Sequence, residues 1–374
     1  MSKIKVAFRA DASLEMGTGH VMRCLTLANA LKAIGAECQF ICREHQGNLI
    51  EHIRNKGHVT HALPAHPEPV GASLLAIKTP RDEQAPAHSH WLGATQEQDA
   101  IECAAILNGL QSDWLIVDHY ALDARWEATL KPHYRKLMVI DDLADRPHQC
   151  NLLLDQTFGR DAKDYLRWVS SGCRILCGSQ YALLRPEFAA LRTYSLQRRT
   201  TPQLRQLLIT MGGVDKDNAT GKVLAALHGC PLPADCSITV IMGTVAPWLS
   251  EVTRQAQSMP WPTQIMVGVI DMAKMMADSD LAIGAAGATS WERCCLGLPT
   301  IMLVLAENQQ KVAEGLEHAG AAYIIEPSQL HVESLRNLFA ALTEFPMTLL
   351  DMSRTAASIV DGDGVGAVLH LLES

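Results

Sequence analysis

The chain has 374 residues, enough for two or three domains of roughly 100–200 residues each. Hydrophobic residues make up 48% and charged residues 19%, a composition that predicts a packed core and excludes extended disorder. The formal net charge is -8 and no long Lys/Arg run occurs, so no nucleic-acid partner is expected. An acidic chain can still bind a nucleotide, because a pocket needs only local positive potential.

The N-terminal residues and the cysteines indicate a cytoplasmic protein. "MSKIKVAFRADAS" enters a strand-like run directly and lacks the apolar region of a secretory signal. No apolar stretch reaches the roughly 18–20 residues that would span a bilayer, so no membrane partner is expected. The 11 cysteines are scattered and form no CxxC pair, which predicts reduced, buried thiols.

Strands and helices alternate along the first half of the chain. We expect strands at 4–8 and 37–42 with a helix over 19–34 between them, then strands at 113–118 and 136–141 with a helix between those two. Such alternation predicts a parallel, doubly wound sheet, and the Val/Ile/Leu-rich strands agree because both faces of that sheet are covered.

A proline-rich segment, residues 64–95, interrupts this alternation and predicts a long loop near the ligand site. Its histidines (His66, His88 and His90) have no recognisable ligand spacing, so metal is not expected there.

A second alternating series follows a polar stretch at 191–203, which we interpret as a linker. Strands are expected at 204–213, 237–243, 263–268, 281–287 and 299–305, and a last helix at 361–374. The chain thus reads as an α/β protein with Rossmann-like domains at 1–190 and 204–360. Ligands of such sheets bind at the carboxyl ends of the strands, here in a cleft between the two domains.

Four turns of small residues follow predicted strands. They contain Gly17 and Gly19 before His20, Gly212 with Gly213, Gly243, and Gly284 to Glu292. A glycine turn that opens a helix presents backbone N–H groups to an anion such as a diphosphate, although neither the P-loop nor the GxGxxG pattern occurs.

In the fourth turn, beside Gly287, two side-chain roles stay open. Thr289 or Ser290 could cap a helix and contact phosphate. Glu292 could favour the helix dipole or accept hydrogen bonds from both hydroxyls of a ribose.

Several of these segments together resemble a known family. They are "FRADASLEMGTGHVMRCLTLANAL", "VDHY", "VIDDLADRPHQCNLLLDQ", "YALLRPEF", "ITMGGVDKDNAT" and "GAAGATSWERCCLGLPTIMLVLAENQ", spanning roughly residues 4 to 325 in order. The chain resembles the UDP-2,4-diacetamido-2,4,6-trideoxy-β-L-altropyranose hydrolases of pseudaminic acid biosynthesis. This resemblance implies the GT-B architecture, similar to MurG-type glycosyltransferases, with the nucleotide held mainly by the C-terminal half.

The resemblance also implies an activity and residues for it. The UDP-sugar substrate would be hydrolysed at the anomeric carbon with inversion, giving UDP and the free diacetamido sugar, with no metal and no cofactor. His20 matches the catalytic base, Tyr120 and Asn308 match positions near the sugar, and Glu292 matches the ribose-binding carboxylate of related GT-B enzymes. The 64–95 segment is longer than in some relatives and affects the expected shape of the sugar pocket.

Histidine suits this chemistry, since its unperturbed pKa near 6.5 keeps a neutral base available at about neutral pH. The alternative is that His20 only packs or caps. Asp11 could orient the imidazole, bind the sugar or serve as a turn residue. Arg9 and Arg23 could meet phosphate or sugar, or remain solvated charges.

Two further strand ends carry polar residues. His119 reads as structural, and Asp141 with Asp142 as a solvated loop pair rather than metal ligands.

Two other functions stay open. A GT-B glycosyltransferase would use His20 on an acceptor hydroxyl instead of water, and a non-catalytic sugar-nucleotide binding protein would bind UDP without turnover. The chain shows no basic-apolar membrane helix, which favours a soluble substrate. Its oligomeric state is undetermined, and a monomer is compatible with the sequence.

Overall fold

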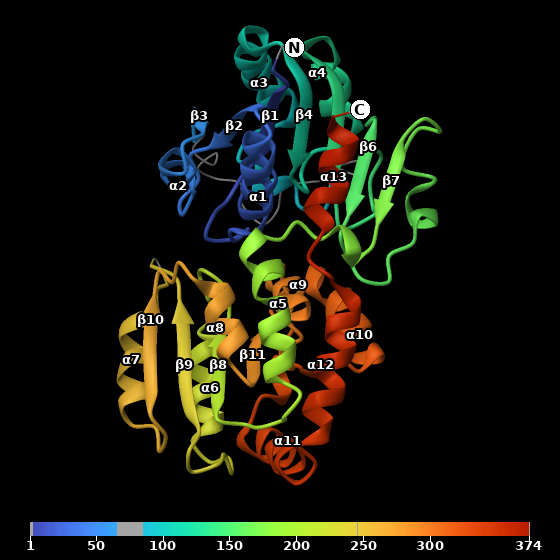
Figure 1. The fold of residues 1–374 in the computed structure, drawn as a ribbon. Coiled ribbons are helices and arrows are strands. Elements are labelled where there is room, and N and C mark those ends of the chain that lie inside the picture. The colour runs from blue at the N-terminus through green and yellow to red at the C-terminus, as the bar shows by residue number, and fades with distance from the viewer. Residues whose placement is uncertain (1–2, 66–84, 245, 374) are drawn as a thin grey trace. The chain divides into compact units, whose positions relative to one another are not determined.

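The structure is a computed structural model that describes residues 3–65, 85–244 and 246–373. The chain divides into two compact units (Figure 1). Unit 1 comprises Met1–Leu183 and Val365–Ser374, and unit 2 comprises Leu184–Gly364. None of the helices in the described ranges has both the length and the apolar character needed to cross a bilayer.

Unit 1 is built on a sheet of seven strands in the order β3-β2-β1-β4-β5-β6-β7, and every neighbouring pair is parallel. The strands are β1 Lys5–Ala10, β2 Glu37–Arg43, β3 Val59–Leu63, β4 Ser112–Asp118, β5 Tyr134–Ile140, β6 Leu152–Asp155 and β7 Arg174–Cys177. Long apolar runs form these strands because helices cover both faces of the sheet, which leaves little surface for polar alternation.

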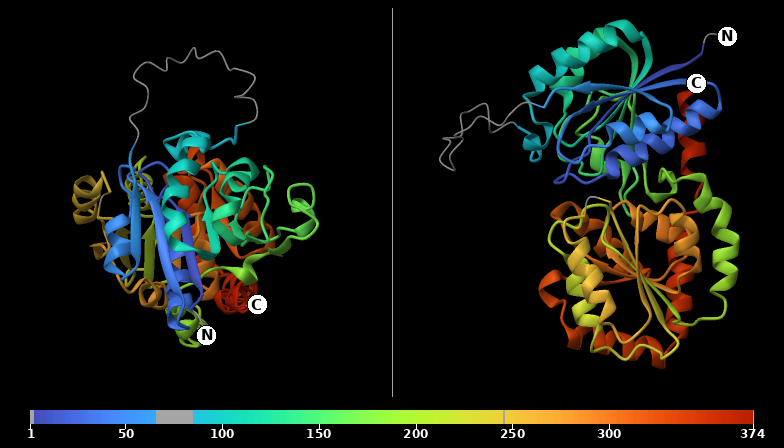
Figure 2. Two further views of the ribbon diagram at one scale, coloured as in Figure 1. Left: turned by 90° about the horizontal axis from the view of Figure 1, so that it is seen from above. Right: turned by 90° about the vertical axis from the view of Figure 1, so that its left-hand side faces the viewer.

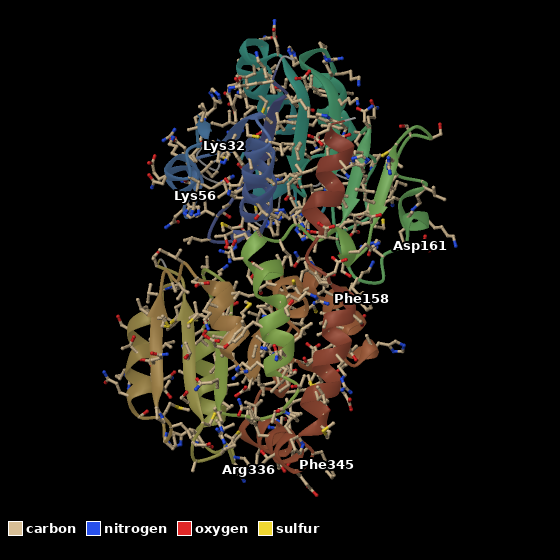
Figure 3. All side chains as sticks on the ribbon, viewed as in Figure 1. Lys32, Lys56, Phe158, Asp161, Arg336 and Phe345 are labelled. Atoms are coloured by element: carbon tan, nitrogen blue, oxygen red, sulfur yellow. The ribbon has the colours of Figure 1, made fainter. Side chains whose placement is uncertain are left out.

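Helices pack against both faces of the unit 1 sheet (Figure 2). They are α1 Gly19–Ala33, α2 Ile50–Asn55, α3 Gln96–Leu110, α4 Ala124–Leu130 and the C-terminal α13 Gly364–Leu372. One core includes residues of α1, α2 and α13, and the other includes residues of α3 and α4. Lys32 of α1 donates to the carbonyl of Gly57 at 2.8 Å, and Lys32 and Lys56 lie near each other in Figure 3.

Unit 2 contains a second parallel sheet, of six strands in the order β10-β9-β8-β11-β12-β13. The strands are β8 Gln206–Thr210, β9 Ser237–Met242, β10 Thr263–Val267, β11 Leu281–Ala285, β12 Thr300–Leu303 and β13 Ala322–Ile325. The helices are α5 Pro186–Arg198, α6 Ala219–Leu227, α7 Leu249–Gln257, α8 Met272–Asp278, α9 Thr289–Cys295, α10 Gln310–Ala319, α11 Val332–Glu344 and α12 Met347–Ile359. Phe345 follows α11 and is exposed (Figure 3).

The predicted strands are present, with boundaries shifted by at most three residues, but four others were not predicted. These are β3, β6, β7 and β13, each only four or five residues long. Short strands carry little periodic signal, and these four lie toward the ends of the two sheet orders. Most of the expected 64–95 loop lies outside the described residues, His66 included, while Ser89–Leu92 forms a short 3-10 helix, η2.

The observed division differs from the predicted domain plan. Most of the expected 191–203 linker is helix α5, which begins with Pro186 at its first position, and the units divide after Leu183. The predicted last helix exists as α13, but it belongs to unit 1: Val368 and Leu372 join the core on the α1 face. The indole of Trp114 donates to the carbonyl of Leu372 at 3.0 Å.

Each sheet has one point at which the strand order reverses. In unit 1 it lies between β1 and β4, and in unit 2 between β8 and β11. Ligands of open parallel sheets bind at the carboxyl edge of such a switch point. The segments that leave these four strands are therefore where a site is expected.

Candidate functional site

His20 and Asp118 meet at the switch point of unit 1. His20 is the second residue of α1, which follows β1, and Asp118 is the last residue of β4. Nδ1 of His20 lies 2.6 Å from Oδ1 of Asp118. His20 is 7% exposed as a residue, and no hydrogen bond to its Nε2 is found among the residues that the structure describes. This contact makes Nδ1 the proton-bearing nitrogen and leaves the lone pair on Nε2.

The segment before α1 is a closed loop that sets the start of the helix. Gly17 has φ +78°, a conformation that favours glycine, and its N–H donates to the carbonyl of Ser13 at 2.9 Å. Gly19 then begins α1 directly, and Thr18 makes no side-chain cap. The two glycines therefore serve the turn that delivers His20 beside the end of β4.

Asp118 is fully buried and charged. Arg23, one turn after His20, donates to both of its oxygens at 2.6 and 2.7 Å. Burial raises the pKa of the Asp118 carboxyl, but the ion pairs with Arg23 and His20 outweigh burial and hold the pKa well below its usual range. An ionised carboxylate at Nδ1 stabilises a protonated imidazole.

Arg23 also connects this pair to a second carboxylate. Its Nη1 donates to Oδ2 of Asp142 at 2.7 Å, and the same oxygen accepts the hydroxyl of Tyr120 at 2.8 Å. The Tyr120 ring meets the His20 ring edge-on with centroids 4.5 Å apart. Five side chains from three chain segments thus form one network around the imidazole.

Asp118 was not among the predicted site residues, although "VDHY" was quoted for its tyrosine. Its sequence signal is a carboxylate that ends a buried strand. The strand order that puts it beside α1 cannot be read from periodicity.

The structure corrects the roles considered for Arg9 and Asp11. Both side chains have no exposed surface, and Arg9 Nη1 lies 2.6 Å from Asp11 Oδ1 while Arg9 Nη2 pairs with Asp99 at 2.7 Å. They are a buried ion network, so neither a ligand contact nor a solvated charge fits them. Asp11 does not orient His20, because that contact belongs to Asp118.

The strand ends next to this network are also buried. Nδ1 of His119 accepts the N–H of Ala121 at 3.1 Å, so Nε2 carries the proton and faces Asp11 at 3.3 Å, as fits a structural histidine. The solvated loop pair expected at 141–142 is wrong. Asp141 is fully buried with Arg146 and Tyr165, and the Asp142 carboxylate is engaged by Arg23 and Tyr120.

No group of three or more His, Cys, Asp or Glu side chains among the described residues is arranged to hold a metal ion. All 11 cysteines are free thiols, and nine of them are buried.

In unit 2 the glycine turns approach one another at the carboxyl edge. A Cβ on Gly243, after β9, would collide with the backbone oxygen of Gly213, after β8. The β8 turn continues to Asp215, whose buried carboxylate accepts the N–H groups of Ala219 and Thr220 at the start of α6. Gly243 must therefore lack a Cβ for its turn to pack closely against the backbone of Gly213 beside the unit 2 switch point.

The turn after β11 differs in detail from expectation. Neither Thr289 nor Ser290 caps α9; Ser290 is fully buried and its Oγ accepts from Arg293 at 3.1 Å, so it does not face a ligand. Gly287 and Thr289 keep partial exposure. Glu292 is partly exposed, and Oε1 lies 3.7 Å from Nη2 of Arg185.

Glu292 and Asn308 are the two predicted ligand residues of unit 2 that lie beyond the glycine turns. Burial raises the pKa of Glu292, with Arg185 opposing the shift. Asn308 is exposed in the short 3-10 helix Glu307–Gln309 after β12. Within each unit the predicted residues lie at or just after the carboxyl ends of the strands, but Arg9, Asp11 and Ser290 are fully buried there.

The comparisons with known proteins agree with this architecture. Residues 208–363 match the glycosyltransferase family 28 C-terminal domain. The crystal structure of MurG from Acinetobacter baumannii superposes with a TM-score of 0.69 at 15% identity, covering 100% of this chain and 99% of that one. The chain has the GT-B fold.

Curated relatives of this GT-B chain include two bacterial proteins. UDP-2,4-diacetamido-2,4,6-trideoxy-β-L-altropyranose hydrolase of Campylobacter jejuni is 24% identical over 318 residues, 85% of this chain and 97% of that protein. The resemblance derived from the sequence motifs is therefore confirmed. Spore coat polysaccharide biosynthesis protein SpsG of Bacillus subtilis is 28% identical over 209 residues, 55% of this chain and 60% of that protein's length.

Proposed function

We propose that this protein is an enzyme acting on a UDP-sugar, and that it hydrolyses UDP-2,4-diacetamido-2,4,6-trideoxy-β-L-altropyranose at the anomeric carbon with inversion. The observation that carries the proposal is the 2.6 Å contact of His20 with a buried, ionised Asp118 at the switch point of unit 1. The likeness to the hydrolase over 85% of the chain supports the choice of substrate.

The chemistry assigns a role to each member of the network. Water attacks the anomeric carbon on the face opposite UDP, and Nε2 of His20 takes its proton while the bond from carbon to the diphosphate oxygen breaks and UDP leaves with the electron pair. Asp118 stabilises the imidazolium that forms. Arg23 keeps Asp118 ionised and fixes its orientation.

The nucleotide is assigned to unit 2. UDP is a good leaving group that needs its charge stabilised more than it needs protonation, and backbone N–H groups supply that without a metal. The turns at Gly213 and Gly287 and the carboxylate of Glu292 are the proposed contacts to the diphosphate and ribose.

The test is turnover of this UDP-sugar by metal-free protein in ¹⁸O-water, followed by NMR. Label on the anomeric carbon of the free sugar is expected. Label on the phosphate, or no turnover, contradicts the proposal. His20→Asn should reduce turnover by at least ~100-fold while UDP still binds. His148→Asn is the matched control, because His148 makes the same 2.6 Å contact with buried Glu127 outside the network.

A glycosyltransferase is the second candidate, because the match over residues 208–363 is to a glycosyltransferase domain. The same base would then deprotonate an acceptor hydroxyl. The ¹⁸O experiment separates the two: a transferase releases little free sugar until an acceptor is added, and a hydrolase turns over fully in water alone.

A further inference from the structure

An aromatic cluster extends from the catalytic histidine to the η2 segment. The Tyr120 ring, edge-on to His20, stacks with Trp91 at a centroid distance of 5.8 Å and an interplanar angle of 27°. His88 lies 4.4 Å from the Trp91 ring and 5.5 Å from the Tyr120 ring. The cluster thus joins the proposed general base to η2, near the end of the 64–95 segment.

Two contacts hold η2 in place. Leu92 is 1% exposed and packs in the core on the α3 face of the sheet, which fixes the position of its neighbour Trp91. On the other side, His90 Nε2 lies 3.2 Å from Glu15, in the loop that leads into α1. The position of Trp91 is therefore fixed by its two neighbours: Leu92 packs against the sheet, and His90 contacts the loop that positions His20.

Exposure within the cluster is uneven. Tyr120 is buried, with 5% of its surface exposed, because Trp91 and His88 cover it. Trp91 and His88 remain partly exposed. Burial lowers the pKa of His88, which keeps its ring neutral and able to stack. The accessible aromatic surface near the base belongs to Trp91 and His88.

We propose that Trp91, supported by His88, is a specificity-determining wall of the sugar subsite that selects sugars rich in methyl groups over fully hydroxylated ones. This inference rests on the proposed function. The diacetamido, 6-deoxy sugar carries two acetamido methyls and the C6 methyl, and an aromatic face beside the anomeric centre gives these methyls an apolar surface to contact. A hydroxyl at the same place loses water without gaining a hydrogen bond.

Binding is measured first, without turnover, in the His20→Asn background. The probes are the diacetamido nucleotide, UDP-N-acetylglucosamine and UDP. Trp91→Ala should lower the affinity for the diacetamido nucleotide by about tenfold or more, which is the scale of one lost methyl contact, and should leave the affinity for UDP unchanged. Trp91→Phe should restore most of that loss, because it keeps a ring.

Trp168→Ala is the matched control. Trp168 is a half-buried tryptophan of the same unit that stacks on Arg167 instead, and the thermal unfolding midpoint of each variant reports its fold. Unchanged affinity in Trp91→Ala, or an equal loss for all three probes, overturns the proposal. So does an equal loss of sugar affinity in the Trp168 control.

The second measurement uses the active protein. Trp91→Ala should shrink the ratio of kcat/KM for the diacetamido nucleotide over UDP-N-acetylglucosamine by about tenfold. The two hypotheses fail differently. Wild-type protein that binds the diacetamido nucleotide but releases no free sugar contradicts the hydrolase, whereas normal hydrolysis with an unchanged ratio in Trp91→Ala contradicts the role of Trp91.

Discussion

The carboxylate of Asp118 touches Nδ1 of His20 at 2.6 Å while both of its oxygens receive N–H groups from Arg23. The aspartate is thereby held ionised in a buried place, at the end of the strand next to β1. A second pair, His148 with Glu127, has the same separation but lies outside the network. Comparing the two pairs separates a catalytic role from a structural one.

Asp118→Asn should reduce turnover by at least ~100-fold, because a neutral amide does not stabilise the imidazolium formed during proton transfer. UDP affinity should be unchanged, since the nucleotide is assigned to unit 2. Steady-state kinetics and UDP titration are the measurements. Glu127→Gln alters the second pair and should lower stability while retaining kcat per folded molecule. Equal kinetic losses in the two variants would show that the Asp118 effect is structural.

Arg23→Lys tests whether the shape of the guanidinium matters as well as its charge. Arg23 donates to Asp118 and to Asp142 at once, which a single ammonium cannot reproduce. We expect kcat to fall by at least about tenfold and the free energy of unfolding to fall by about 1–3 kcal/mol.

The control for Arg23→Lys is Arg43→Lys. Arg43 is fully buried and bridges Asp99 and Glu102 at 2.7 and 2.8 Å, but it does not contact the His20 network. It should lose similar stability with normal kcat. A fully active Arg23→Lys protein is incompatible with the positioning role.

Most strands could be predicted from the sequence. Parallel sheets covered on both faces need apolar strands, and such strands appear in the sequence as runs of apolar residues. The sequence also singled out His20 and Tyr120 through motif resemblance. Asp118 and the Asp142 contact were missed because they depend on strand order, which brings residues about 100 positions apart together. Arg9 and Asp11 were misjudged for a related reason: polarity at a strand end does not reveal burial in an ion network.

Asp155 provides a pH-dependent prediction. Burial, followed by the nearby charge of Asp142, raises the pKa of Asp155 to about 6. A carboxyl whose pKa is higher folded than unfolded binds protons more tightly in the folded state, so its contribution to stability falls as pH rises from the unfolded pKa of about 4 through about 6. Asp155→Asn should therefore gain stability relative to wild type over this interval, by about 1–3 kcal/mol.

The measurement for Asp155→Asn is the free energy of unfolding by denaturant from pH 4 to pH 8. Asp164→Asn is the control: Arg160 pairs with Asp155 at 2.6 Å and also contacts the solvent-exposed Asp164 at 3.5 Å. This control removes a partner of Arg160 without removing a buried carboxyl, so it separates the loss of an ion pair from the loss of the buried titrating group. A difference for Asp155→Asn that stays constant or reverses its sign contradicts the raised pKa.

Gly287→Ala isolates the proposed nucleotide contact in unit 2. The nearest atom to an added Cβ is Gln309 Nε2 at 3.9 Å, and the backbone of Gly287 is outside the positive-φ region, so the fold should accept the methyl. If diphosphate approaches this backbone closely, the methyl blocks it, and UDP affinity should fall by about tenfold, equivalent to ~1.4 kcal/mol. Titration calorimetry with UDP measures this, and the thermal unfolding midpoint should stay within a few degrees of wild type.

Gly320→Ala is the comparison: Gly320 ends α10 with φ +80° and open space around it, so its variant should lose stability and keep UDP affinity. UDP binding as tight as wild type in Gly287→Ala would remove this turn from the nucleotide site.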